Sequence, residues 1–168
     1  MRKEFAVKPI ALPQPVFIIG TYDKDGTPNA MNAAWGCHNE MDQMMFALAK
    51  GHKTVKNLLE TKAFTVSMGT VEQLAACDYV GLVSGSKEPR KVEKAGFHAK
   101  KALHVNAPYF EELPMTLECE VLSYNEETEI LTGRIVGISA DESILTGENI
   151  DPKKLRPLCL LYTSPSPR

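Results

Sequence analysis

Residues 115–139, MTLECEVLSYNEETEILTGRIVGIS, contain the pattern that decides the fold. Apolar and polar side chains alternate from Met115 to Val121, with Cys119 in one of the apolar places, so this cysteine is expected in the core. Alternation with a period of two is typical of an antiparallel strand with one buried face. The polar run NEETE at 125–129 predicts a turn, and ILTGRIVGIS at 130–139 is predicted to return as the partner strand.

A second hairpin is predicted near the N-terminus. PVFIIGTYD at 15–23 is rich in β-branched and aromatic residues, which indicates a strand buried on both faces. DKDGTPN at 23–29 predicts a turn, because Asp and Asn bond locally, glycine permits positive φ and Pro28 blocks continuation. NAMNAAWGCH at 29–38 and QMMFALA at 43–49 are predicted to be the next two strands.

The middle of the chain predicts a helix between two strands. Thr54 is expected to cap a helix over VKNLLETK at 55–62, and AFTVSMG at 63–69 is expected to return as a strand. The whole chain then has about six strands and two or three short helices. Two strand–helix–strand passages also fit a parallel α/β sheet, but the hairpins at both ends favour an antiparallel barrel.

A further helix is predicted after the strand at 63–69. Residues 70–73, TVEQ, match a capping box, in which Thr and Gln satisfy each other's backbone donors. The helix they open is predicted to turn Val71, Leu74 and Ala75 toward the core, and GLVSGS at 81–86 is predicted to end it.

Length and composition define the class of protein. A chain of 168 residues with 43% hydrophobic and 24% charged residues is sufficient for one self-supporting domain. No stretch approaches the roughly 18 apolar residues of a membrane span, and the start of the chain is unlike a secretory signal. The four cysteines lack zinc or Cys-x-x-Cys spacing, so we expect reduced thiols and a cytoplasmic protein.

Charge is unevenly distributed along the chain. The net charge of −2 argues against a general affinity for nucleic acid. Residues 86–101 nevertheless hold six Lys or Arg against two Glu, with a short helix predicted near 89–95, while residues 111–129 hold seven Glu and no Lys or Arg. The basic run is either a solvated surface helix or a site for a small anion.

Most catalytic motifs are missing. There is no G-x-G-x-x-G or G-K-[ST] sequence, and the four histidines lack metal-site spacing, so neither a Rossmann site nor metal catalysis is predicted. Ser84 stands one position too late for G-x-S-x-G, which favours a turn hydroxyl.

Three short segments fit an anion cradle. They are the small-residue run 29–35, His-Lys-Thr at 52–54 before a helix N-terminus, and Ser-Gly-Ser at 84–86 followed by Arg90 and Lys91. Ordinary caps and turns have the same composition. The residues alone therefore predict a β-rich domain with a candidate site for a small phosphate.

Five segments taken in order carry a family resemblance. They are PQPVFIIGTYDKDGTPNAMNAAWGC (13–37), HKTVKNLLETKAFTVSMG (52–69), CDYVGLVSGS (77–86), RKVEKAGF (90–97) and APYFEELPMTLECEV (107–121). Together they resemble the flavin reductase-like family of FMN-binding split barrels, which includes the flavoredoxins. The likeness covers about residues 8–158, and its most specific pieces are NAMN-x-x-W and T-x-x-N-L-x-E-T-x-x-F-T-V.

The resemblance implies a mainly β fold with short helices, a six-stranded antiparallel Greek-key split β-barrel that binds FMN near the interface of a homodimer. It assigns the phosphate and ribityl chain to Asn29, Ala30, Met31 and Asn32. It places along the flavin ring Ala34, Trp35, Gly36 and Cys37. It closes the phosphate cradle with Lys53, Thr54, Ser84, Gly85 and Lys91. Lys91 takes the place of the lysine in the family's D-K-F motif, where Arg90 and Val92 replace the other two residues.

The implied activity is redox chemistry supplied by the flavin, with no catalytic side chain of the protein's own. We expect an NAD(P)H-dependent flavin reductase, in which NADH or NADPH reduces bound FMN and electrons pass to free flavin or another acceptor. A flavoredoxin-like electron carrier without its own NAD(P)H activity is the main alternative, and a flavin-free binding module is a third. The expected partners are flavin, nicotinamide and a second copy of the chain, and neither nucleic acid nor membrane.

The barrel domain is expected to span residues 1–158. The remaining residues 159–168 end in TSPSPR, a Ser/Pro run without a core-forming pattern. They are expected to form an irregular tail that is truncated or non-native.

Overall fold

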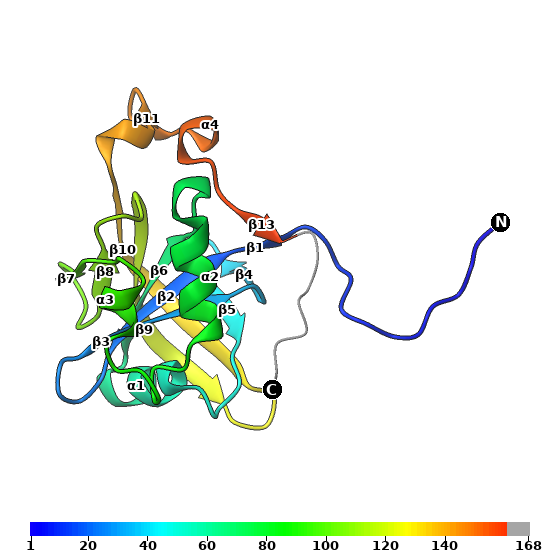
Figure 1. The fold of residues 1–168 in the computed structure, drawn as a ribbon, viewed down its shortest axis with the longest axis horizontal. Coiled ribbons are helices and arrows are strands. Elements are labelled where there is room, and N and C mark those ends of the chain that lie inside the picture. The colour runs from blue at the N-terminus through cyan, green and yellow to red at the C-terminus, as the bar shows by residue number, and fades with distance from the viewer. Residues whose placement is uncertain (161–168) are drawn as a thin grey trace.

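One seven-stranded antiparallel sheet dominates the computed structural model, which describes residues 1–160 (Figure 1). Its strands are β2 (Phe17–Tyr22), β3 (Pro28–Ala33), β4 (Gly36–Glu40), β5 (Gln43–Ala47), β6 (Ala63–Met68), β9 (Met115–Asn125) and β10 (Ile130–Ala140). Their order across the sheet is β3-β2-β6-β9-β10-β5-β4, and every neighbouring pair is antiparallel. The mainly β fold predicted from the hairpins is confirmed.

Smaller elements surround this sheet. Three two-stranded ladders pair β1 (Gln14–Pro15) with β13 (Cys159–Leu160), β7 (Ala99–Lys101) with β8 (Pro108–Phe110), and β11 (Leu145–Thr146) with β12 (Asn149–Ile150). The helices are α1 (Lys53–Thr61), α2 (Leu74–Leu82), α3 (Lys91–Lys94) and α4 (Pro152–Leu155), with 3-10 turns η1 (Val71–Gln73) and η2 (Glu142–Ile144). Within residues 1–160, no helix is both long and apolar enough to span a bilayer.

The sheet curls because its two edge strands are consecutive in the chain. β3 ends at Ala33 and β4 begins at Gly36, although they lie at opposite edges. In a flat sheet, six interstrand spacings would separate these edges by about 29 Å. Three Cα–Cα steps reach only about 11 Å. The residues between these strands, which we call the seam (Ala34–Trp35), therefore hold the sheet in a nearly closed barrel.

Apolar side chains pack on both faces of the curled sheet. Inside, the Phe46 ring makes edge-on contacts with Phe17 and Phe64, at centroid distances of 5.5 and 6.3 Å. Helix α1 closes one end of the barrel, because its Val55 and Leu58 belong to the same cluster (Figure 1).

A second cluster lies outside the sheet. Val16 and Ile18 pack there with Ala76, Cys77 and Val80 of α2. Strand β2 is thus buried on both faces, as predicted.

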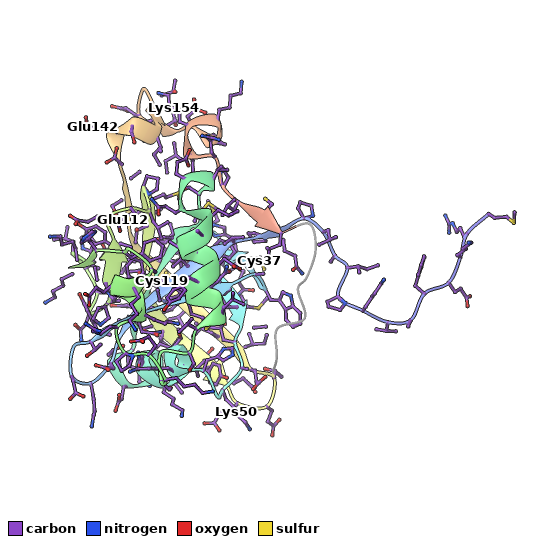
Figure 2. The ribbon with its side chains drawn as sticks, in the orientation of Figure 1. Cys37, Lys50, Glu112, Cys119, Glu142 and Lys154 are labelled. Atoms are coloured by element: carbon purple, nitrogen blue, oxygen red, sulfur yellow. The ribbon has the colours of Figure 1, made fainter. Side chains whose placement is uncertain are left out.

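The predicted hairpin at 115–139 is confirmed, with one difference. Cys119 lies in the interior, where burial raises its thiol pKa to about 12 (Figure 2). The polar face is also covered: Thr116 shares a 2.9 Å hydrogen bond with Ser67, and Glu118 accepts backbone hydrogen bonds from the loop after β7. Because this loop covers Glu118 and a hydrogen bond joins Thr116 to the neighbouring strand, the prediction of a half-exposed strand is wrong at 116–118.

Other local predictions need correction. The segment 29–38 forms two strands broken at the seam, so the sheet has seven strands where six were expected. Helix α1 begins at Lys53 with His52 at its N-cap, so Thr54 lies inside the first turn. The expected capping box at 70–73 is absent: η1 forms there, and the Thr70 side chain makes no cap bond.

The helix after β6 faces the opposite way from the prediction. Val71, Leu74 and Ala75 are exposed, while Ala76, Cys77 and Val80 face the sheet. The extra 3-10 turn rotates the following helix relative to the predicted start.

The predicted irregular tail at 159–168 begins with two residues that pair with β1. Residues 161–168 of that tail lie outside the described part of the chain.

Candidate functional site

Four buried polar side chains join helix α1 to the β2–β3 hairpin. The strand register places Thr21 opposite Asn29. The Asn29 amide Nδ2 donates to Thr54 Oγ1 at 2.9 Å, and Asn57 Nδ2 donates to Thr21 Oγ1 at 3.1 Å. Hydrogen bonding makes burial of these groups tolerable, and it fixes the start of α1 against the start of β3.

One atom of this network has no partner. The side-chain oxygen Oδ1 of Asn29 is buried and accepts no hydrogen bond within the described structure. It faces the turn after α2, where a Cβ at Gly85 would collide with it. The same imaginary Cβ would lie 3.4 Å from Lys53 Cδ. An unsatisfied buried acceptor costs about 1–3 kcal/mol, so this position favours a ligand that brings a donor.

Lys53 stands at the rim of the same position and is held by Asp23. Its Nζ lies 3.1 Å from Asp23 Oδ2, and both side chains are largely covered. The other carboxylate oxygen accepts from the backbone amides of Asp25 and Thr27. Partial burial raises the pKa of Asp23, but hydrogen bonds from Thr27, Lys53 and Asp25 outweigh it and lower that pKa below its usual value.

A second ammonium group is buried nearby. Lys91 is only 3% exposed, and its Nζ donates to the carbonyls of Val80 at 3.1 Å and Val83 at 2.8 Å, at the end of α2. Burial and the charge of Lys53 lower the pKa of Lys91 to about 8. His52 lies in the same surroundings. Partial burial and the charge of Lys91 lower the pKa of His52, and together they outweigh Glu129, which raises it, so this pKa is below its usual value.

The N-terminus of α1 points into this group of cations. His52 provides no side-chain cap, and the first turn holds no acidic residue. The first backbone N–H groups and the positive end of the helix dipole are therefore open to an anion.

The structure thus brings five predicted site residues together: Asn29, Lys53, Thr54, Gly85 and Lys91. We call this group the α1-end site. It combines a buried acceptor with two ammonium groups and an uncapped helix. A ligand that fits needs a hydroxyl donor beside an anionic group, as in a phosphorylated polyol.

Three of the remaining predicted residues, Ala30, Met31 and Asn32, are divided between the two faces of β3. Met31 packs against the interior cluster, whereas Ala30 belongs to the outer one. Asn32 donates its amide to the Cys77 carbonyl of α2 at 3.2 Å. Ser84 is exposed in the turn after α2, where its hydroxyl accepts from the Ser86 amide at 3.3 Å.

The predicted ring-lining residues lie at and beside the seam. Trp35 is 44% exposed, and its carbonyl accepts from the Ala47 amide at 2.9 Å. Gly36 packs under the Phe46 ring, and Cys37 is exposed on β4. Asn29 and Ala34 are five residue steps apart along extended chain, a span of about 17 Å. Only an elongated ligand could contact both the α1-end site and the seam.

Three residues that complete the α1-end site were missed by sequence reasoning: Asp23, Thr21 and Asn57. A signal existed for Asp23, because the DKDG turn returns the chain toward Asn29. The hairpin register could also have paired Thr21 with Asn29.

A hollow of about 690 Å³ lies elsewhere, over β8, β9 and the end of β10. None of the predicted site residues lines it. Among residues 1–160, no cluster of three or more His, Cys, Asp or Glu side chains could hold a metal ion.

Known proteins are similar to this chain in fold and in sequence. The sequence profile described as "Flavin reductase like domain" matches residues 10–163. The flavoredoxin of Desulfovibrio vulgaris is 33% identical, with a TM-score of 0.88 over 95% of this chain and 87% of its own. A flavoredoxin from Methanosarcina acetivorans is 26% identical, with a TM-score of 0.84 over 98% and 88% of the two chains.

The fold class is confirmed by a more distant structure. A protein with a split barrel domain from Shewanella frigidimarina is 16% identical, and its TM-score is 0.77 over 88% of this chain and 78% of its own.

Proposed function

Because the chain belongs to the flavin reductase like domain family, we propose that it binds FMN and works as a redox protein. The observation that carries this proposal is the buried Asn29 Oδ1, which lacks a donor beside Lys53 and Lys91. FMN provides both missing features: ribityl hydroxyls that donate, and a phosphate that accepts from ammonium and backbone N–H groups.

The residues of the α1-end site would hold the phosphate end. Lys53 and the first amides of α1 would contact the phosphate, Lys91 would add charge behind them, and Asn29 and Thr54 would bind the ribityl chain. The flavin ring would then extend along β3 toward Trp35, Gly36 and Cys37, with Ala30, Met31, Asn32 and Ala34 between the two ends and Ser84 at the rim. When bound, the flavin supplies the redox chemistry, and the chain positions it.

We further propose that NADH or NADPH is the electron donor, as in a flavin reductase. This proposal needs no acid–base pair from the protein, since the nicotinamide and the flavin carry out the hydride transfer themselves. The flavoredoxin neighbours favour a second candidate, an electron carrier reduced by another protein.

Anaerobic mixing of the FMN-loaded protein with NADH or with NADPH separates the two candidates. Bleaching of the flavin absorbance that is complete within seconds of mixing supports the reductase. Unchanged absorbance with both donors, together with bleaching by dithionite, supports the carrier. A purified chain whose absorbance and melting temperature do not respond to FMN would contradict both.

The α1-end site is tested by Lys53→Ala and Thr54→Ala. Each is expected to weaken FMN binding by about tenfold, since a charge-assisted or buried hydrogen bond is worth about 1.5 kcal/mol. Lys56→Ala, on the exposed side of α1, is the matched control. Unchanged affinity in both variants would remove these residues from the site.

We also propose a homodimer in the cytoplasm as the working form.

A further inference from the structure

The hollow of about 690 Å³ over β8, β9 and the end of β10 shares no residue with the α1-end site. The strands around it are on the left in Figure 1. Ligand pockets in proteins commonly measure about 300–1,000 Å³, so this hollow is large enough for a small molecule. We call it the outer hollow.

A buried carboxylate lies at the floor of the outer hollow. Glu118 is only 5% exposed, and its two oxygens accept from the backbone amides of Leu103 at 3.3 Å and His104 at 2.6 Å. Among residues 1–160, no ion pair involves this carboxylate. A buried charge without an opposite charge is costly, and a carboxylate oxygen can accept more than one hydrogen bond. Glu118 therefore favours a ligand that brings a cation.

The loop after β7 (residues 102–107) is anchored at several points, so the wall that it forms is fixed. Its apolar side chains pack with the start of β6 in one small cluster: Ala63, Ala102, Val105 and Ala107. The Ala102 amide also donates to the Ala107 carbonyl at 2.9 Å. The His104 ring packs closely on β10, since a Cβ at Gly137 would lie 2.5 Å from it. Small-molecule sites are usually preformed in this way.

The rim of the outer hollow is apolar. Leu103, on the loop after β7, is 85% exposed, and Ile138, on β10, is 62% exposed. The inner wall includes the buried side chains of Phe110 and Leu113. Exposed apolar side chains around a concave surface are typical of a binding site, because a ligand removes them from water. The apolar part of such a ligand would cover Leu103 and Ile138.

The charged side chains around the outer hollow are mainly acidic. Glu111, Glu118 and Asp141 line it, and Lys101 is the one lysine or arginine among the described lining residues. Glu111 has a partner of its own, because its Oε1 lies 3.8 Å from Lys100 Nζ. The charge that remains without a cation is thus the buried one, and it favours a positively charged ligand over an anion.

We propose that the outer hollow binds an organic cation, an amine or amidine with an aromatic or branched apolar body. The cationic nitrogen would donate to Glu118, and the apolar body would lie between Leu103 and Ile138. This site goes beyond the proposed FMN site and is expected to bind its ligand whether or not FMN is present.

Tryptamine is a suitable probe, since it carries an ammonium group on an indole ring. The two control compounds, 3-ethylindole and indole-3-propionate, keep the ring but are neutral and anionic. By calorimetric titration of the full chain, with and without FMN, tryptamine is expected to bind about tenfold more tightly than either control, as one charge-assisted hydrogen bond predicts. The NMR signals of the Leu103 and His104 amides, which donate to Glu118, are expected to shift. No binding of tryptamine at millimolar concentration, or equal affinity for the three compounds, would overturn the proposal.

Two variants test the role of charge. Glu118→Gln is expected to weaken tryptamine binding about tenfold. Its matched control is Glu120→Gln, because Glu120 lies on the same face of β9 but outside the outer hollow. Ile138→Lys changes an exposed side chain, and its ammonium group at the rim is expected to weaken tryptamine binding about fivefold by repulsion. Unchanged affinity in both variants would overturn the proposal, and Ile138→Lys decides the outcome if Glu118→Gln does not fold.

A second copy of the chain is the other occupant that this test would reveal. Shifts of the Leu103 and His104 amides that grow with protein concentration, without tryptamine, would identify the hollow as a contact between copies and overturn the proposal. FMN affinity is measured on the same samples. A chain that binds tryptamine but not FMN would contradict the proposed function alone, and one that binds FMN but not tryptamine would contradict the outer hollow alone.

Discussion

Lys53 Nζ lies 3.1 Å from Asp23 Oδ2, so the ammonium group expected to bind a phosphate already has a carboxylate partner. The carboxylate is held in place from its other oxygen by the amides of Asp25 and Thr27. The Asp23 carboxylate cannot rotate away from a phosphate that approaches Lys53 unless these two hydrogen bonds break. Asp23 therefore competes with the phosphate for Lys53.

Asp23→Asn is expected to strengthen FMN binding about two- to fivefold. The amide oxygen of Asn can still accept the two turn hydrogen bonds, while the negative charge is lost. The gain corresponds to at most about 1 kcal/mol, typical of a partly exposed ion pair. Fluorescence titration with FMN measures it, and riboflavin, which lacks the phosphate, should bind both proteins equally. Weaker FMN binding by the variant would show instead that Asp23 orients Lys53.

FMN affinity is expected to fall as the pH rises through about 8. Lys91 has its pKa lowered to about 8, so in the free site it loses its positive charge above that pH. The loss of one linked proton weakens binding of an anion by up to about tenfold between pH 7 and 9. Titration at several pH values measures the effect. Riboflavin should show a flat profile, and so should FMN with Lys91→Arg, since arginine stays charged throughout. Parallel profiles for FMN and riboflavin would place Lys91 outside the site.

Thr54→Val is expected to destabilise the fold by about 1–3 kcal/mol. The substitution keeps the shape of the side chain but leaves the buried Asn29 amide without its 2.9 Å acceptor. Urea denaturation without FMN measures this loss. Thr54→Ser retains the hydroxyl and should lose less than about 1.5 kcal/mol. A larger loss for Thr54→Ser than for Thr54→Val would mean that packing of the methyl group, and not the hydrogen bond, matters at this position.

Gly36→Ala is expected to destabilise the fold by about 1–3 kcal/mol, because the new methyl group would overlap the Phe46 ring. Gly51→Ala is the matched control, since a methyl group there meets no atom within 4 Å. Thermal unfolding without FMN separates two roles for Gly36. A stable Gly36→Ala protein with weakened FMN binding would favour contact with the ligand over core packing.

The hairpins could be predicted from the sequence because their signals are local. Alternation at 115–121 and the turn at 23–29 depend on neighbouring residues, and both appear in the structure. The burial of Thr116 and Glu118 could not be predicted this way. Glu118 is covered by the loop after β7 and Thr116 is bonded to Ser67, and both partners come from another part of the chain.

The face of α2 that packs on the sheet could not be predicted either, for a different reason. Its apolar residues fit two opposite faces almost equally well, and the 3-10 turn at 71–73 decides which face meets the sheet. In the α1-end site, residue types identified Lys53 and Thr54, but the Asp23 partner depended on how the hairpin turn approaches α1. Resemblance also grouped Ala30 and Asn32 with Asn29, whereas the strand pleat turns alternate residues to opposite faces.

The seam also limits the circumference of the barrel. Ala34 and Trp35 are the whole connection between β3 and β4, the two edge strands of the sheet. Other loops can lengthen without changing the circumference, because they join strands that are already neighbours or elements outside the sheet. An insertion between Ala33 and Gly36 would release the two edges from each other. The spacing of the barrel edges beside Trp35 is therefore limited by the number of residues between two strands, whatever their side chains.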